Sequence, residues 1–238
     1  MAMTLDELVS AVREVCANDL VTVVLYGSAA GRDYHGAASD QNVLVIVQSA
    51  DATRLTSMAP AVRKWVGSGN PPPLILTLAE WESRADVFAI EYADLIERHR
   101  VLLGTLPTER VRVRARDLRV QLESETMGKL LRFRRGLMSA AGNAERTREL
   151  LDDSLSSLLA LLRATLHLHG EPIPPTSEQL CDRVAALATF SPDAFRAVLA
   201  NRRGTQRLAD GQLDGVVRGY LSALESLVAY VDGVQVPE

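Results

Sequence analysis

The chain has 238 residues, of which 47% are hydrophobic and 24% charged, and its formal net charge is −4. This composition is typical of a folded protein with one large or two modest domains, and it excludes a disordered chain. The small net charge argues against nucleic-acid binding, and the leucine-rich stretch 155–168 is too short to span a bilayer. Cys16 and Cys181 match no metal or redox spacing, so we expect a reduced, cytoplasmic protein.

The first 108 residues alternate between helix and strand patterns. Thr4 and Glu7 form a capping-box sequence, so a helix begins there. The apolar spacing then predicts a short helix from Ser28, a longer helix at 52–66, and strands at 21–26, 42–47, 74–78 and 87–92. We therefore expect an α+β domain at 1–108, in which helices flank a small mixed sheet.

Residues 109–238 carry only helical patterns. Helices are predicted at 117–140, 145–169, 177–188 and 213–231, and Ser191-Pro192 marks the start of another. Short connections favour antiparallel neighbours, so this second domain is expected to be an all-α helical bundle.

The connection between the first two predicted strands carries the residues of greatest chemical interest. A tight turn at Gly27 would let backbone N–H groups approach phosphate oxygens, and the Ser28 hydroxyl would donate a hydrogen bond to them. Read alone, this is an ordinary turn and Asp40 is an ordinary residue at a strand start. Together they predict a phosphate site beside an acid.

Asp40 and residue 42 lie two apart, so their side chains share one face of a strand. Two carboxylates there would hold a pair of Mg²⁺ ions, but the second residue is Asn42, which keeps an oxygen ligand and loses the charge. The usual third ligand comes from a neighbouring strand, for which Glu91 is the first choice and Asp94 the second.

The segments LYGSAAGRDYHGAASDQNVLVIV and AIEYADLIERHRVLLG resemble the DNA polymerase β nucleotidyltransferase superfamily. The resemblance is strongest to its small bacterial GSxARG…SDxD branch, which includes the kanamycin-type and minimal nucleotidyltransferases. The family's Arg-Gly order appears here as Gly31-Arg32, and its second metal-binding Asp as Asn42. The resemblance implies that Gly27, Ser28 and Arg32 bind the nucleotide. It also implies that Asp40, Asn42 and Glu91 hold Mg²⁺, with Asp40 and Glu91 as catalytic acids.

Kanamycin-type enzymes also take a carboxylate base and a lysine from their helical domain. Glu125 and Lys129 lie four residues apart on one predicted helix and match this pair. The alternative is a plain surface ion pair. A cluster of arginines nearby offers further cations for a triphosphate, comprising Arg110, Arg112, Arg114, Arg116 and Arg119.

The sequence thus supports two functions. The first is Mg²⁺-dependent transfer of a nucleoside monophosphate from an NTP to a hydroxyl acceptor, on a small molecule or a protein. The alternative, supported by Asn42, is a catalytically impaired homologue that binds a nucleotide, or a protein partner through the helical domain. Neither involves a membrane.

Overall fold

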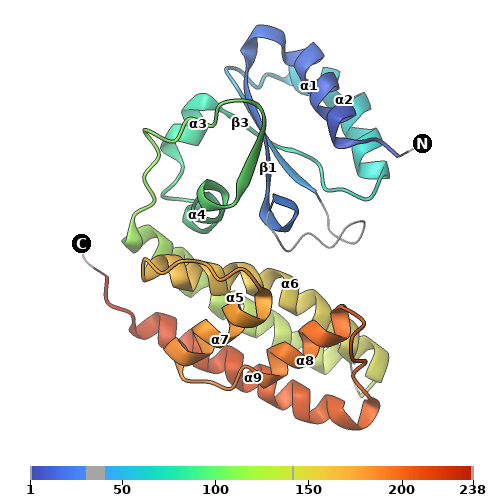
Figure 1. The fold of residues 1–238 in the computed structure, drawn as a ribbon, viewed down its shortest axis with the longest axis vertical. Coiled ribbons are helices and arrows are strands. Elements are labelled where there is room, and N and C mark those ends of the chain that lie inside the picture. Colours follow the sequence, from blue (N-terminus) through green and yellow to red (C-terminus); the bar gives the residue numbers. More distant parts are fainter. Residues whose placement is uncertain (1, 31–40, 141, 237–238) are drawn as a thin grey trace. The chain divides into compact units, whose positions relative to one another are not determined.

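The structure is a computed structural model that describes residues 2–30, 41–140 and 142–236, with the side chain of Ser28 also outside the description. The chain divides into two compact units, residues 1–113 and 114–238 (Figure 1). The sequence predicted a boundary after residue 108. No helix in the described part of the chain is both long and apolar enough to cross a membrane.

The N-terminal unit is built on a four-stranded mixed sheet of order β3-β2-β1-β4. β1 pairs antiparallel with β2 and with β4, whereas β2 and β3 are parallel. The strands span Leu20–Tyr26 (β1), Asn42–Val47 (β2), Leu74–Thr77 (β3) and His99–Gly104 (β4). This sheet and its helices confirm the predicted fold class.

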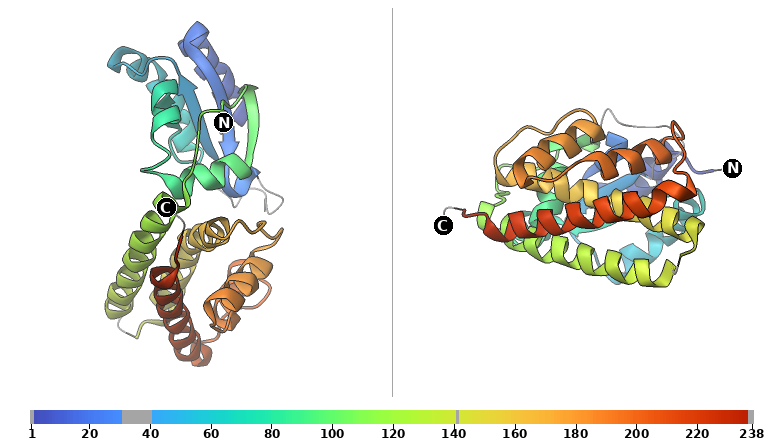
Figure 2. Two further views of the ribbon diagram at one scale, coloured as in Figure 1. Left: turned by 90° about the vertical axis from the view of Figure 1, so that its left-hand side faces the viewer. Right: turned by 90° about the horizontal axis from the view of Figure 1, so that it is seen from below.

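Helices cover both faces of the sheet (Figure 2). Leu5–Cys16 (α1) and Ala52–Gly67 (α2) pack on one face, where they meet the odd-numbered side chains of β1 and β2. Leu78–Ser83 (α3) and Ala89–Glu97 (α4) pack on the other, against the even-numbered ones. Because both faces are buried, the two strands read as continuous apolar runs in the sequence.

The strand predicted at 87–92 is wrong. Helix α4 begins at Ala89, and the fourth strand of the sheet is β4, at 99–104. Tyr92 and Leu95, three positions apart, both face the core, and the Tyr92 ring stacks on Trp81 with ring centroids 4.5 Å apart. This packing follows the period of a helix, which a six-residue apolar run does not reveal by itself.

Two short 3₁₀ turns flank β1, at Ala17–Asp19 (η1) and Gly27–Ala30 (η2). The sequence predicted a short helix from Ser28, and η2 occupies the start of that segment. The capping box at the start of α1 is confirmed, because the Thr4 hydroxyl accepts from the Glu7 N–H and the Glu7 carboxylate accepts from the Thr4 N–H.

The C-terminal unit is helical, as predicted (Figure 2, right). Aromatic rings fill its core, where Tyr220 lies between Phe133 and Phe195 with centroid separations of 4.8 and 4.9 Å. Gly136 lets two of its helices approach closely, since a Cβ there would lie 2.4 Å from Leu150 Cδ1. Its helices span Ala115–Ala140 (α5), Ala144–Leu168 (α6), Ser177–Ala188 (α7), Asp193–Arg202 (α8) and Asp210–Gly233 (α9).

Candidate functional site at the end of the sheet

A tight turn and a polar strand start lie together at one end of the sheet. Gly27 follows β1 with φ +76°, in the left-handed region that favours glycine. A Cβ at this position would lie 3.3 Å from Nδ2 of Asn42, the first residue of β2. The glycine therefore brings the turn backbone close to the Asn42 amide.

Three polar side chains form a row across this end of the sheet. Tyr26 is paired in register with Asn42 on β2 and with His99 on β4, so the three side chains share one face. This is the face that α3 and α4 cover, because Tyr26 packs against their core. His99 is held in place by a 3.0 Å hydrogen bond between Nδ1 and the Ile96 carbonyl.

Glu91 belongs to the same end of the unit. Burial raises the pKa of the Tyr26 hydroxyl, and the negative charge of the Glu91 carboxylate raises it further. Glu91 is an exposed residue in the first turn of α4. It thus acts on Tyr26 from a covering helix and not, as the sequence suggested, from a strand.

β3, the parallel neighbour of β2, offers no carboxylate level with Asn42. The parallel register pairs Leu44 with Leu74, and continuing it by two residues sets Pro72 level with Asn42. A hydrogen bond of 3.1 Å from the Gln41 N–H to Asn70 Oδ1 supports this alignment. The sequence predicted a third acidic ligand from a neighbouring strand. At the position level with Asn42, just before β3, the chain has Pro72 instead.

The remaining predicted residues of this site fall outside the description. Asp40 and Arg32 belong to the segment 31–40, and the side chain of Ser28 is not described. Across the described ranges, no group of three or more His, Cys, Asp or Glu side chains is placed to hold a metal ion.

The donor set nevertheless has the chemistry of a hard cation site. Asn42 offers an amide oxygen and Glu91 a carboxylate at the same end of the sheet, and Asp40 precedes Asn42 by two residues. Oxygen donors suit Mg²⁺, but two carboxylates and one neutral oxygen suit one ion better than two.

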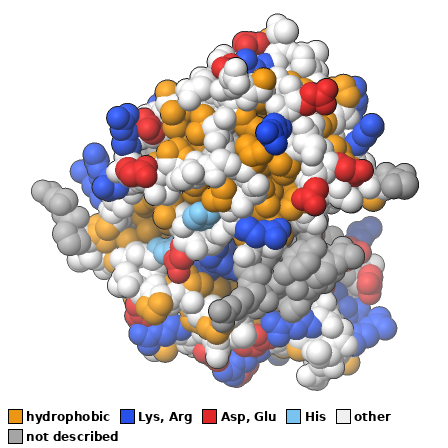
Figure 3. Space-filling model, turned by 45° about the horizontal axis from the view of Figure 1, so that its top comes forward, with side chains coloured by type: hydrophobic (Ala, Val, Ile, Leu, Met, Phe, Trp, Pro, Cys, Tyr) orange, Lys and Arg blue, Asp and Glu red, His pale blue; other side chains and the backbone are white. Residues whose placement is uncertain are grey.

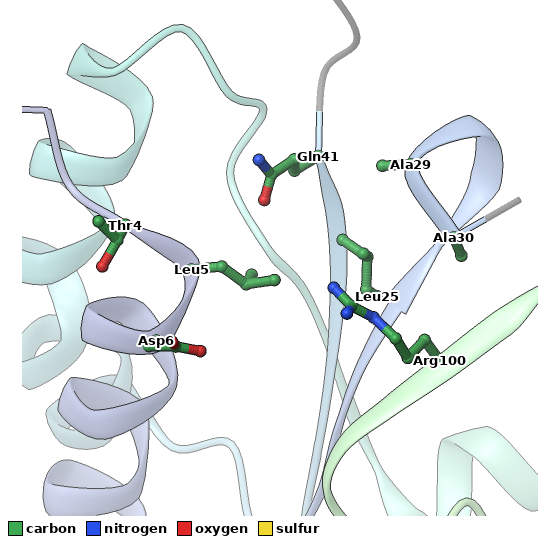
Figure 4. A pocket seen from close by; sticks show the side chains of 8 residues that line it. All are labelled: Thr4, Leu5, Asp6, Leu25, Ala29, Ala30, Gln41 and Arg100. Carbon is green, nitrogen blue, oxygen red and sulfur yellow. The ribbon is translucent and has the colours of Figure 1, made fainter. Parts of the chain in front are cut away.

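A cavity of about 550 Å³ opens on the opposite face at this end (Figure 4). Arg100 of β4 and Asp6 of α1 project toward it, and Ala30 and Gln41, on either side of segment 31–40, also line it. Arg100 is opposite Leu25 in register. The sequence did not single out this cation, because β4 was not recognised as a strand.

The two residues singled out in the helical unit do not pair with each other. Glu125 lies 3.5 Å from the Arg132 guanidinium, on the exposed side of α5. Lys129 is only 6% exposed, and its Nζ donates a hydrogen bond to Ser157 Oγ of α6. The alternative prediction, a surface ion pair between Glu125 and Lys129, is therefore wrong.

Burial lowers the pKa of Lys129 to about 8. The nearby positive charge of Arg132 adds to this effect, and the negative charge of Asp153 opposes it. A lysine in this state carries less than a full positive charge at mildly alkaline pH.

Two of the arginines singled out in the sequence, Arg119 and Arg110, have structural partners. Arg119 donates to the backbone carbonyls of Val234 and Asp232 at the end of α9, at 2.9 and 3.2 Å. Arg110 lies 3.4 Å from Glu82. On the face drawn in Figure 3, basic and acidic side chains are interspersed, in keeping with the small net charge.

No protein-family model and no curated protein sequence matches the chain. Among solved structures, it is similar to spectinomycin adenyltransferase AAD(9) from Enterococcus faecialis, determined with ATP and spectinomycin. The TM-score is 0.53 and the sequence identity 12%, and the similarity covers 96% of this chain and 98% of that one. The likeness shows that the chain shares the fold of that adenyltransferase, a nucleotidyltransferase-like α+β fold followed by a helical region.

Proposed function

We propose that the chain binds a nucleoside triphosphate at the Gly27 end of its sheet and transfers the nucleoside monophosphate to a hydroxyl acceptor. The observation that carries this proposal is the close approach of the Gly27 turn to Asn42, at the end of the sheet where the Glu91 charge acts on Tyr26. A turn of this kind would bind phosphate, and oxygen donors near it would hold a cation.

Each residue has a defined part in the proposal. The backbone N–H groups at Gly27 and the hydroxyl of Ser28 bind the phosphates, and Arg32 adds positive charge. Asp40, Asn42 and Glu91 would hold Mg²⁺, which when bound offsets negative charge on the triphosphate.

The helical unit supplies the residues for the acceptor. Glu125 would take the proton of the acceptor hydroxyl. The acceptor oxygen would then bond to the α-phosphorus of the NTP as the bond to the leaving pyrophosphate breaks. Lys129 would bind phosphate, for which its Nζ must leave the hydroxyl of Ser157. The acceptor is a small molecule or a protein, and the spectinomycin of the similar adenyltransferase is an example of the first class.

The cysteines support the expected compartment. Cys16 and Cys181 are both free thiols and both buried. Unpaired, buried thiols suit a protein that works in the reducing cytoplasm.

One pair of observations favours a second candidate, a homologue that binds nucleotide without transferring it. Asn42 stands where the resemblance implies a carboxylate, and the residue level with it, just before β3, is Pro72. Fewer negative charges would hold Mg²⁺ more weakly, and a two-metal mechanism needs both ions.

Isothermal titration of the protein with ATP, GTP, CTP and UTP in the presence of Mg²⁺ tests the proposal. Binding of at least one nucleotide is expected, and no heat from any of the four would refute both candidates. An Asn42→Asp variant then separates them. Slow transfer by the parent chain that the variant accelerates supports the first candidate, and turnover that appears only in the variant supports the second.

A further inference from the structure

Helix α5 carries two apolar faces. The first packs inside the helical unit against α6 and α9, and includes Leu118, Leu122, Leu130 and Phe133. The second is an exposed stripe on the opposite side of the helix. Its members are exposed by 57% at Val120, 44% at Met127, 48% at Leu131 and 74% at Met138.

The four stripe residues lie on one line. At about 100° per residue, they fall within an arc of roughly 40° and cover roughly 27 Å of helix. Scattered exposed apolar residues are ordinary, but a straight stripe along a 26-residue helix is typical of a helix-pairing surface. α5 also runs along one edge of the helical unit (Figure 2, right).

The order of the stripe residues is symmetric. Val120 and Met138 each lie nine positions from residue 129, and Met127 and Leu131 each lie two positions from it. A two-fold axis through this midpoint would set Val120 against Met138 of a second copy and Met127 against Leu131. A self-complementary surface of this kind is what a symmetric dimer requires.

The charges beside the stripe favour the antiparallel arrangement. Glu123 and Arg134 both lie on the side of the stripe that faces α9. Arg134 contacts Glu225 of α9 at 2.6 Å. Glu123 pairs with Arg119, which donates a hydrogen bond to a backbone carbonyl just after α9. Glu123 is six positions before the midpoint and Arg134 five after it, so opposite charges meet across an antiparallel pair. In a two-fold parallel pair, the α9 sides of the two helices would lie on opposite edges of the contact, so Glu123 and Arg134 would not meet.

We infer that the exposed stripe of α5 is a docking surface for a second copy of this chain, with the two α5 helices antiparallel. The stripe contributes four residues per copy, fewer than the roughly 20–30 residues per partner of a standard stable interface. The dimer is therefore reversible, with a dissociation constant on the order of 1–100 µM. This inference is independent of the proposed nucleotide site.

Sedimentation equilibrium of the full chain between about 1 and 200 µM tests the inference, a range that spans the expected constant. A concentration-dependent monomer–dimer equilibrium is expected, and Leu131→Glu should weaken it at least about tenfold by placing charge at the centre of the stripe. Leu55→Glu is the matched control, because Leu55 is 41% exposed on α2 and lies outside the stripe. Circular dichroism melts establish that both variants fold.

Charge exchange tests the orientation. Glu123→Arg and Arg134→Glu should each self-associate more weakly than the parent, because like charges then face each other. An equimolar mixture of the two variants should restore the dimer, because both facing pairs then again carry opposite charges. A parent chain that stays monomeric throughout, or a dimer that Leu131→Glu leaves intact, would overturn the inference. If the equimolar mixture associates no more strongly than either variant alone, the antiparallel arrangement is overturned.

Discussion

Replacing Lys129 by methionine should stabilise the helical unit at neutral pH. Lys129 is buried between α5 and α6, with its pKa lowered from 10.5 to about 8. A base whose pKa is lower in the folded state than in the unfolded state is protonated at a cost to folding. At 1.36 kcal/mol for each pKa unit, this cost is about 3 kcal/mol below pH 8.

The variant does not gain the whole of this amount. Methionine has a similar length and buries well, but it cannot donate the hydrogen bond that Lys129 makes to Ser157. Losing that bond removes about 1 kcal/mol, so a net gain of about 1–2 kcal/mol is expected at pH 7. The gain should raise Tm by several degrees.

The pH dependence distinguishes this cause from better packing. In the parent chain, the cost falls as Lys129 loses its proton above pH 8, and it vanishes above pH 10.5, where the unfolded chain is also neutral. The advantage of Lys129→Met in urea denaturation should therefore shrink between pH 8 and pH 10.5. Lys64→Met, on the exposed side of α2, serves as control.

The titration itself is directly observable. The chain has two lysines, Lys64 and Lys129, so ¹³C-lysine labelling gives two Cε signals that the two variants assign. The Lys129 signal should titrate near pH 8. A Lys129 signal that titrates at the ordinary value of 10.5, or a variant that is less stable than the parent at pH 7, would refute the reasoning.

Three further substitutions have definite expected outcomes. Gly104→Ala should destabilise the sheet by at least about 2 kcal/mol in denaturant titrations, because φ is +75° and a Cβ would lie 2.2 Å from a β1 carbonyl oxygen. Arg148→Met should lower stability by about 1–3 kcal/mol, since this buried arginine bonds a backbone carbonyl at 2.9 Å; unchanged unfolding would contradict that role. Gly27→Val should abolish nucleotide binding in calorimetry by displacing Asn42, whereas Gly69→Val, with φ of +92° and open space around it, should retain it.

The sequence predicted the strands and helices that burial determines locally. β1 and β2 are apolar on both faces, and their run lengths and the turn residues between them predict two strands. The capping box at Thr4 depends on residues three apart. In these segments, the interactions that determine the structure lie within a few residues of one another.

The errors arose where distant packing decides the structure. The segment 87–92 is a helix start because Tyr92 stacks on Trp81 eleven residues earlier, whereas its short apolar run also fits a strand. β4 was missed because it is an edge strand that begins with the polar pair His99 and Arg100, which weakens its apolar pattern.

In the candidate site too, local pattern predicts some features, whereas distant packing determines others. The proximity of Gly27 and Asn42 follows from antiparallel pairing of the strands on either side of one connection, and the sequence predicts it. The burial of Lys129 depends on Ser157, 28 residues away on another helix, and no local pattern indicates it. Arg100 likewise reaches its cavity through the pairing of β4 with β1.

The central claim is that a nucleotide binds where β1 ends and β2 begins. Amide chemical shifts recorded by ¹H–¹⁵N NMR during titration with an NTP and Mg²⁺ test it most directly. We expect the largest shifts at Gly27 and Asn42, with smaller ones at Glu91. Saturating shifts confined to other parts of the chain, or none at millimolar nucleotide, would contradict it.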